Sequence, residues 1–397
     1  MSQQAHSITA DEDLNSCIRN CTLPFSQLPF DDVDSLVLSS LSYLNFSSYP
    51  LEEVTTQDRI PLIDILRFSG FSDLTCGTWL KEGDDVEAFL IAVATSVRYR
   101  DLSISFFVQE DSPRIDKQFS AVTFFAADMP PYIAFRGTDG SVSGWKEDFD
   151  IAYKDVIPSY TAALRYLSGV LSTLPRSIHV NVGGHSKGGH LAEYSAACID
   201  VNGFMRIDHI YNHDGPSFLK EPSVRFNGVD YNKKLHKTIP ESSIFGMILE
   251  RRDDYRVVRS KASTVFQHRP LTWLSSNHRF SYVEAIEGKA RLFDETLDTW
   301  LRSSTPEQRE IFLTTVFNLV KSTDATSWDE LSSSLGNARI LLKNSTEIDD
   351  ATREIIIEVI MRLLTNVRTQ AAGYFSQRLS QMFERVPLVG SAKNDER

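Results

Sequence analysis

The chain has 397 residues, of which 42% are hydrophobic and 24% charged, so it is long enough for two or three domains of about 150 residues with a sizeable core. Its formal net charge of -12 at pH 7 would repel a polyanion, which excludes nucleic acid as an expected partner. Four cysteines without metal-ligand spacing, a polar N-terminus and the lack of an apolar run of about 18 residues argue against a metal site, a signal peptide and a transmembrane segment.

Two helices are predicted near the start of the chain, after a polar stretch. Residues 1–25 are expected to form a flexible N-terminal tail. Apolar residues recur at helical spacing over 30–46, where Asp31 or Asp32 can act as the N-cap. The segment 85–99 is predicted to be a mostly buried helix.

Strands begin where the apolar period changes to alternation, at Leu102, Ile104, Phe106 and Val108. The predicted strands are 102–108, 119–126, 132–137, 177–184, 207–212, 236–240 and 255–260, and the predicted helices among them are 159–174 and 187–199. This order predicts an α/β fold over residues 26–282, with a mainly parallel sheet and covering helices.

The strand signal ends near residue 283, and residues 283–397 are expected to form a C-terminal helical region. In the segment 305–320, Thr305 is the expected N-cap and Gln308 closes a capping box. Two further helices are predicted, over 327–335 and 349–367.

The stretch GHSKG at residues 184–188 has the pattern G-x-S-x-G and places Ser186 between a predicted strand and a predicted helix. In this context the chain turns so sharply that the serine takes strained dihedral angles, and Gly184 and Gly188 leave room for the turn. The hydroxyl is then presented at a helix N-terminus, which stabilises negative charge. We therefore interpret Ser186 as a nucleophile.

A second stretch, YIAFRGTDGSVSGWKEDF at residues 132–149, is a strand that ends in a polar, glycine-rich loop. Acyl transfer needs two oxyanion donors, and the backbone N–H groups of Thr138 and Lys187 are the candidates, while the Lys187 ammonium is expected to be exposed near the cleft. Together with GGHSKGG, this stretch resembles the class 3 lipase pattern, F-R-G-[ST], then W-x-x-D, then G-H-S-x-G-G. The resemblance implies that Thr138 is the oxyanion residue and that Asp148 orients it.

More closely, the chain resembles the Mbeg1-like family, a lipase-like group with a domain of unknown function (DUF2974). The matching pieces run from residue 28 to residue 273 and are LPFDDVDSLVLSSLSYLNF, AFRGTDGSVSGWKEDF, GGHSKGGHLAEYSAA, YNHDGPSF, IPESSIFGMIL and FQHRPLTW. The resemblance implies an α/β-hydrolase-like catalytic domain over 26–282 followed by a helical tail, and it leaves the substrate open.

A serine nucleophile needs a general base, and in α/β-hydrolases the chain order is serine, acid, histidine. The candidates after Ser186 are His209, His213, His236, His268 and His278. His268 follows a predicted strand, in the kind of loop that carries the base, and His278 is the reserve choice. His209 lies within a strand, and His190, one helical turn after the serine, is expected to pack.

The acid that orients the base has three candidates. Asp214 directly follows the strand after the elbow helix, which is similar to the acid of pancreatic-type lipases, and the carboxyl end of a strand suits a catalytic carboxylate. The class 3 acid aligns near Ser243, which carries no charge. Asp253 and Asp254 are the alternatives, although their surroundings are typical of a solvated charge cluster. We favour Asp214.

The sequence therefore predicts a serine hydrolase that cleaves an ester or thioester, with the triad Ser186, His268 and Asp214 and an oxyanion hole at Thr138 and Lys187. The resemblance and the abundant phenylalanine suggest a lipid-like acyl substrate. No cofactor is expected, the expected location is cytoplasmic, and protein partners are left open. Two alternatives remain, a peptidase or amidase, and a non-catalytic binding or scaffold protein that keeps the fold.

Overall fold

The structure of the protein is a computed structural model. It describes residues 11–47, 59–69, 71–75, 84–115, 117–138, 147, 150–151, 154–226, 228–243, 245–262, 267–286, 299–301, 303–305, 308–309, 350 and 353–357. The chain splits into two compact units, residues 1–317 and 318–397. In the second unit the described residues include three buried isoleucines, Ile355, Ile356 and Ile357.

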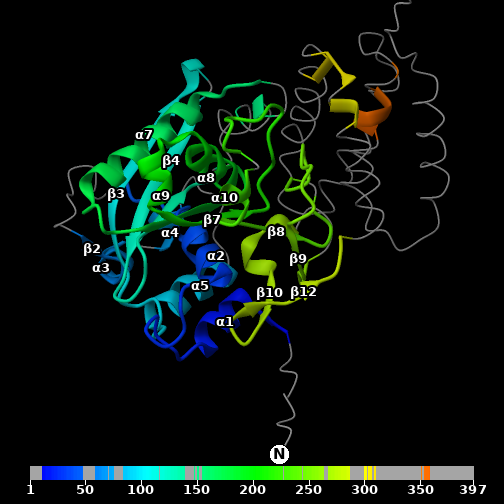
Figure 1. Ribbon diagram of the computed structural model, residues 1–397. Coiled ribbons are helices and arrows are strands. Elements are labelled where there is room, and N and C mark those ends of the chain that lie inside the picture. The colour runs from blue at the N-terminus through cyan, green and yellow to red at the C-terminus, as the bar shows by residue number, and fades with distance from the viewer. Residues whose placement is uncertain are drawn as a thin grey trace, which may run out of the picture. The chain divides into compact units, whose positions relative to one another are not determined.

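A nine-stranded sheet forms the centre of the first unit (Figure 1), with the order β12-β9-β8-β7-β6-β5-β4-β3-β2. Its strands are β2 (Ile60–Pro61), β3 (Ser103–Ser112), β4 (Lys117–Phe125), β5 (Tyr132–Phe135), β6 (Val180–His185), β7 (Ile207–His213), β8 (Leu235–Pro240), β9 (Arg256–Val258) and β12 (Tyr282–Val283). The α/β class is therefore confirmed.

The sheet is mixed, which corrects the prediction of a mainly parallel sheet. Neighbouring strands run parallel from β5 through β9, but antiparallel from β2 through β5 and between β9 and β12. Connection length explains the difference, because a parallel pair needs a crossover of a dozen or more residues. β3 and β4 are joined by the short 3-10 helix Pro113–Ile115 and β4 and β5 by a short loop, so these pairs must be antiparallel.

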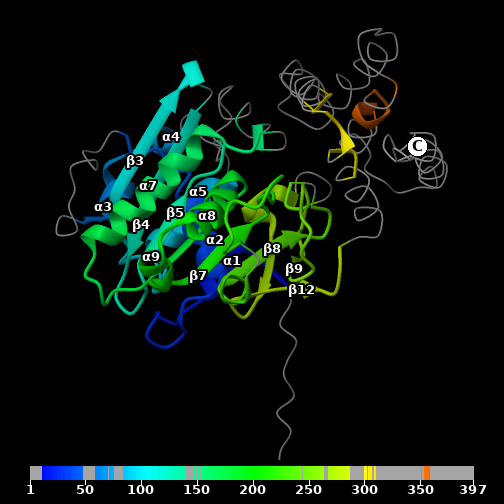
Figure 2. The same ribbon diagram turned by 45° about the horizontal axis from the view of Figure 1, so that its top comes forward.

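Helices cover both faces of the sheet (Figures 1 and 2), as α7 (Pro158–Thr173) and α8 (Lys187–Cys198) pack on one face and α2 (Asp32–Leu41) and α5 (Asp84–Thr95) on the other. Alternate residues of β5 serve the two resulting cores. The other helices are α1 (Leu14–Asn20), α3 (Leu62–Phe68), α4 (Phe71–Thr75), α9 (Val201–Met205) and α10 (Val229–Asn232).

The predicted helix caps are present at both ends of the first unit. Asp31 caps α2 and forms a reciprocal capping box with Asp34. The N–H of Thr305 donates to Gln308 Oε1 at 2.9 Å, and the N–H of Gln308 donates to Thr305 Oγ1 at 3.2 Å, which confirms that capping box. The predicted helix over 327–335 lies outside the described residues, as do most of the helices predicted over 305–320 and 349–367.

Part of the expected N-terminal tail is folded. The strand β1 (Glu12–Asp13) pairs with β10 (Leu274–Ser276), which also pairs with β11 (Arg279–Phe280), and α1 follows with Leu14, Cys17 and Ile18 buried. The tail prediction is therefore wrong for residues 12–20, because so short a helix is stable only through tertiary packing, which local sequence does not reveal. The domain boundaries after residues 25 and 282 stay predictions.

Within the described ranges, no helix combines the length and the apolar character that crossing a lipid bilayer requires.

Candidate active site

Ser186 occupies a strained turn between β6 and α8. Its dihedral angles are φ 57° and ψ -131°, a region that a residue with a side chain rarely adopts. The turn is held by a hydrogen bond from the Ser186 N–H to His213 O at 2.9 Å, and the Ser186 carbonyl accepts the N–H of Gly189 at 3.0 Å. Ser186 itself is half-buried, between the buried residues His185 and Lys187.

The two flanking glycines are required by close backbone contacts. A Cβ on Gly184 would lie 2.3 Å from the carbonyl carbon of Gly188, and a Cβ on Gly188 would lie 2.1 Å from Phe135 O. The second contact also brings the carboxyl end of β5 against the start of α8. The sequence argument for a sharp glycine-dependent turn is therefore supported by the backbone geometry.

Asp214 lies at the carboxyl end of β7, beside this turn. It has φ 54°, its side chain is fully buried, and its N–H donates to Thr238 O at 2.8 Å. A Cβ on Gly215 would lie 2.3 Å from Ser186 O, so the turn that follows Asp214 packs directly against the elbow. Two residues that are distant in sequence, Ser186 and Asp214, are thus at neighbouring strand ends.

His268 contacts the Asp214 carboxylate, with 2.6 Å between His268 Nδ1 and Asp214 Oδ2. This contact fixes the proton on Nδ1 and leaves Nε2 as the basic nitrogen of the neutral ring. The other carboxylate oxygen, Oδ1, accepts the Ser243 hydroxyl at 2.5 Å and the Gly246 N–H at 3.1 Å. Ser243, near which the class 3 acid aligns, therefore donates a hydrogen bond to the Asp214 carboxylate.

The other acid candidates, Asp253 and Asp254, are exposed to solvent.

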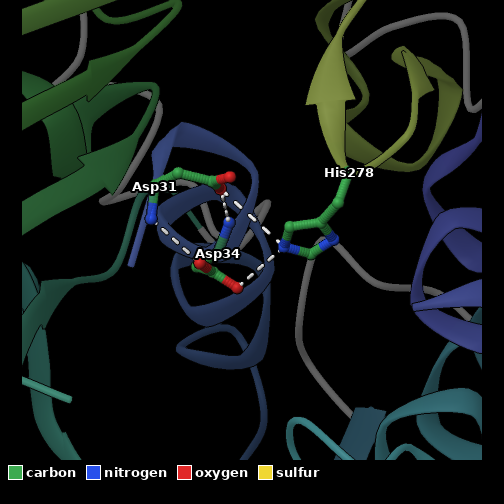
Figure 3. Close-up of side chains that lie close together, drawn as sticks. All are labelled: Asp31, Asp34 and His278. Atoms are coloured by element: carbon green, nitrogen blue, oxygen red, sulfur yellow. Dashed lines mark hydrogen bonds and ion pairs between the residues drawn. The ribbon is translucent and has the colours of Figure 1, made fainter. Parts of the chain in front are cut away.

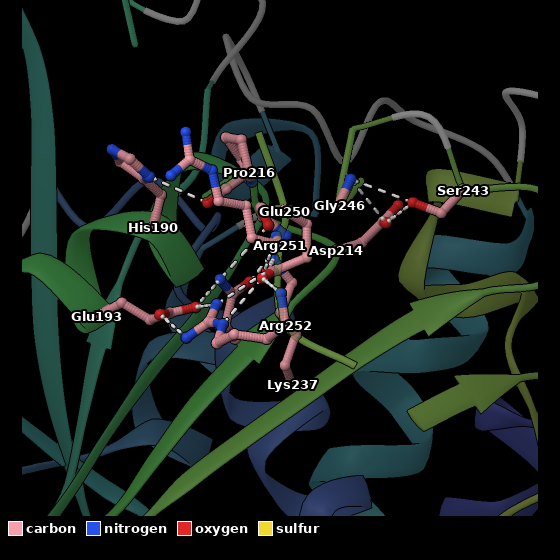
Figure 4. A network of polar contacts seen from close by, with 12 residues as sticks. His190, Glu193, Asp214, Pro216, Lys237, Ser243, Gly246, Glu250, Arg251 and Arg252 are labelled. Carbon is pink, nitrogen blue, oxygen red and sulfur yellow. Dashed lines mark hydrogen bonds and ion pairs between the residues drawn. The ribbon is translucent and has the colours of Figure 1, made fainter. Parts of the chain in front are cut away.

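The residues that precede Asp253 in the same segment are instead anchored inside the protein, by a buried charge network that Figure 4 shows. Arg252 bridges Glu193 of α8 at 2.8 Å and Glu250 at 2.8 Å, and Lys237 of β8 contacts Glu250 at 2.5 Å. This network, Glu193–Arg252–Glu250–Lys237, ties the segment carrying Ser243 and Gly246 to the elbow helix.

Two residues that sequence reasoning missed hold His268, the candidate base, in place. His185, directly before Ser186, donates through Nε2 to His268 O at 2.7 Å and accepts the Tyr43 hydroxyl at Nδ1, at 3.0 Å. Burial and the nearby His268 hold the pKa of His185 well below its usual value, so the ring is neutral. His185 occupies the first variable position of the G-x-S-x-G pattern, and this position was the available sequence signal for it. Tyr43, in the segment after α2, had no such signal in the sequence.

Thr138 is buried just after β5, near the elbow. The adjacent Gly137 leaves no room for a Cβ, which would lie 2.0 Å from the Tyr43 hydroxyl and 2.7 Å from His185 O. The segment of Thr138 and the start of α8 at Lys187 are therefore neighbours. Asp148, the expected supporting aspartate, lies outside the described residues.

The Lys187 side chain is buried, which corrects the expectation of an exposed ammonium. Its side chain is 1% exposed, and its Nζ donates to the carbonyl and to the side-chain oxygen of Gln118, each at 2.9 Å. It also lies 3.2 Å from Glu147 Oε2. The prediction failed because the residues around Lys187 give no local signal of a buried carboxylate that is distant in sequence.

The remaining histidines belong to other environments. His190 packs as expected, with its ring nitrogens 2.6 Å from the Tyr160 hydroxyl and 3.0 Å from Pro216 O, and burial lowers its pKa to about 4. His209, which is exposed, lies 2.9 Å from His236. Burial lowers the pKa of His213 to about 3.

The reserve base, His278, belongs to a separate cluster with Asp31 and Asp34 (Figure 3). Its Nε2 lies 3.1 Å from Asp34 Oδ1, and its Nδ1 lies 3.6 Å from Cys17 Sγ. Burial opposes protonation, but the hydrogen bond with Asp34 raises the pKa of His278 to about 12. The structure therefore does not bring His278 to the Ser186 turn as a base.

The spacing of this cluster would suit a metal ion, but Asp34 and His278 are already bound to other groups. Arg98 binds the Asp34 carboxylate with both Nε and Nη2 at 2.6 Å. Burial alone would raise the pKa of Asp34, but Arg98 and His278 hold it below its usual value. A protonated histidine is not a metal ligand, and Asp34 is already bound by the Arg98 guanidinium, so the residues do not fit a metal ion.

Comparison with protein families matches residues 93–318, more than half of the chain, to the family described as Mbeg1-like. The matched span includes Ser186, Asp214 and His268. No curated protein matches the chain. The resemblance to the Mbeg1-like family noted from the sequence motifs is therefore confirmed.

Proposed function

The chain belongs to the Mbeg1-like family, and from that membership and the geometry around Ser186 we propose that it is a serine hydrolase with an α/β-hydrolase-like fold. The reaction is cleavage of an ester or thioester. The triad is Ser186 as nucleophile, His268 as general base and acid, and Asp214 as the residue that orients the histidine.

A single arrangement carries the proposal, the strained Ser186 turn packed against the turn of an acid that contacts a histidine. The positive φ of Ser186 costs free energy of order 1–3 kcal/mol, which an ordinary strand-to-helix connection has no reason to retain. The buried Asp214–His268 contact of 2.6 Å provides the acid–base pair that a serine nucleophile needs.

In the proposed reaction, Ser186 Oγ attacks the carbonyl carbon while His268 Nε2 accepts the hydroxyl proton. Asp214 stabilises the imidazolium, and the tetrahedral oxyanion is bound by the backbone N–H groups of Thr138 and Lys187. His268 then returns the proton to the leaving group, and a water molecule hydrolyses the acyl-enzyme by the same steps. No metal or cofactor takes part.

The proposed substrate is a lipid-like acyl ester, which rests on the lipase-like motifs and on the aromatic surroundings of the base. The Phe245 ring lies 4.3 Å from the His268 ring, centroid to centroid, and is partly exposed. An apolar face beside the base suits an acyl chain better than a charged peptide. The cytoplasmic location stays a prediction from the sequence.

The test is labelling of the purified protein with a fluorophosphonate, which phosphonylates an activated serine. One label per chain, on the peptide containing Ser186 and absent from Ser186→Ala, is the expected result. A folded wild-type protein that takes up no label would instead favour the non-catalytic binding or scaffold alternative. Comparison of matched p-nitrophenyl ester and p-nitroanilide substrates then separates esterase from amidase.

A further inference from the structure

Lys187 carries a buried charge directly beside the proposed nucleophile. Among the described residues, its ammonium lies 2.9 Å from the Gln118 carbonyl oxygen, 2.9 Å from Gln118 Oε1 and 3.2 Å from Glu147 Oε2. The side chain is 1% exposed. The residue therefore places its amide at the start of α8 and its charge in the interior.

Glu147, the partner of this ammonium, is fully buried and connects three elements. Its Oε1 accepts the N–H of Ser159 at 2.8 Å, at the start of α7. Its Oε2 accepts the Ser159 hydroxyl at 2.8 Å and the N–H of Gln118, in β4, at 3.0 Å. Through Lys187 the same carboxylate also reaches α8.

Stability alone does not explain such a pair. Removing two charges from water costs about as much as their attraction returns, so apolar side chains of similar volume are often as stable. The position of the pair is more informative. Lys187 supplies one of the two proposed oxyanion donors, and Thr138 supplies the other. Glu147 lies a short distance after Thr138 in the sequence.

We propose, on the basis of the proposed function, that the Lys187–Glu147 ion pair is a positioning device for the oxyanion hole. It fastens the residue whose own N–H is the second donor to Gln118 in β4, and β4 pairs with β5, the strand that leads to Thr138. The two N–H groups are thereby held in one geometry before the substrate arrives. Lys187 and Glu147 act through these amides and touch no reacting atom with their side chains.

The two oxyanion donors act on charge that develops only in the transition state. A misplaced donor therefore lowers kcat and weakens binding of tetrahedral anionic adducts, while ground-state binding changes little. If the ion pair were purely structural, its removal would lower stability and leave kcat and the binding of such adducts unchanged.

The experiment compares the wild type with Lys187→Met and Glu147→Gln. Each new side chain has nearly the shape of the one it replaces. The readouts are kcat and KM for a short-chain p-nitrophenyl ester and the Ki of a trifluoromethyl ketone, which forms an anionic tetrahedral adduct with serine. We expect kcat to fall by up to about 10²–10³-fold, as for loss of one oxyanion donor, with KM nearly constant. The Ki should rise by the same factor as kcat/KM falls, and the double variant should lose no more than the worse single variant.

Lys234→Met is the matched control. Lys234 is partly buried and donates to backbone carbonyls of Phe204 and Ile207, at the start of β7 and away from the elbow. This variant is expected to lose some stability and to keep kcat and Ki.

If Lys187→Met and Glu147→Gln also keep kcat and Ki, the pair is only structural and the inference is wrong. If Lys187→Met does not fold, Glu147→Gln decides on the same readouts. If the wild-type protein neither hydrolyses esters nor takes up label at Ser186, the proposed function itself is wrong. This outcome can be told apart from failure of the present inference, in which the wild type is active and the two variants are equally active.

Discussion

Two buried histidine–carboxylate pairs, His268–Asp214 and His278–Asp34, have similar contacts and different surroundings. The nitrogen-to-oxygen distances are 2.6 Å and 3.1 Å. Asp214 receives its other hydrogen bonds from neutral donors, a hydroxyl and a backbone N–H. Asp34 instead binds the Arg98 guanidinium, and the second ring nitrogen of its histidine faces a cysteine.

The difference shows that a histidine–aspartate contact alone does not identify a catalytic pair. His278 has a pKa of about 12 and is a fixed cation that cannot accept a proton near neutral pH. It joins the hairpin of β10 and β11 to α2, and the Asp34 partner Arg98 adds a further attachment. The turn of Asp214, in contrast, packs on a strained serine. We therefore propose a role in chemistry for the first pair and a role in stability for the second.

The largest predicted effect is at Ser186, the proposed nucleophile beside the His268–Asp214 pair. Ser186→Ala should reduce ester turnover by about 10⁶-fold, because the other triad members cannot act without the nucleophile. Thermal unfolding should change little, since the hydroxyl adds little packing. The measurement is hydrolysis of a short-chain p-nitrophenyl ester, and substantial residual turnover would place the nucleophile elsewhere.

Asp214→Asn should keep the local shape but favour the wrong tautomer of His268. The expected fall in kcat is up to about 10⁴-fold, by analogy with the same change in the serine-protease triad. Asp253→Asn and Asp254→Asn are matched controls, because both aspartates are exposed, and they should change kcat by several-fold at most. A crippled Asp253 or Asp254 variant beside a nearly normal Asp214→Asn would move the acid to the later loop.

The second pair should make stability depend on pH in the alkaline range. Below pH 6.5 His278 is protonated in the folded and unfolded chains, so its contribution is complete. Above pH 6.5 the unfolded chain loses this proton while the folded chain, with a pKa of about 12, retains it. The contribution to the free energy of unfolding therefore falls by about 1.4 kcal/mol per pH unit.

Urea unfolding of wild type and His278→Ala between pH 7 and pH 9 measures this contribution. The free energy of unfolding should fall more steeply with pH in the wild type than in the variant. The difference in slope should correspond to one proton, about 1.4 kcal/mol per pH unit. Equal slopes would mean that His278 has no raised pKa in the folded protein, and the contrast between the two pairs would then be lost.

A smaller effect than that of Asp214→Asn is predicted at Ser243, which donates one of the hydrogen bonds to Asp214. Ser243→Ala leaves the Gly246 N–H and His268 on the carboxylate, so kcat should fall by about tenfold, or about 1.4 kcal/mol. Steady-state kinetics at saturating ester measures the change. A fall as large as that of Asp214→Asn would show that the serine has a larger role than support.

The sequence was informative where local chemistry determines the structure. The glycines around Ser186 and the capping residues of α2 act within a few residues, so their patterns predicted the turn and the helix start. The contact of Asp214 with His268 followed from strand order. The same reasoning preferred His268 to His278, because His268 follows a predicted strand in the kind of loop that carries the base.

What the sequence could not predict depends on distant contacts. The burial of Lys187 requires Glu147 and Gln118 from other elements, and the support of His268 by His185 requires the loop after β9. The antiparallel half of the sheet was predictable in principle, because the segments 102–108, 119–126 and 132–137 have no room for helices between them.

The central claim is that His268 serves catalysis and His278 serves stability. Its most direct test is a paired measurement on His268→Ala and His278→Ala at pH 7, with kcat per folded molecule and the free energy of unfolding determined for each. We predict that His268→Ala loses nearly all turnover and keeps most of its stability. His278→Ala should lose about 3–5 kcal/mol of stability, as for a broken buried ion pair, and keep turnover in the molecules that remain folded. The reverse pattern, or equal loss of both properties in both variants, would contradict the account.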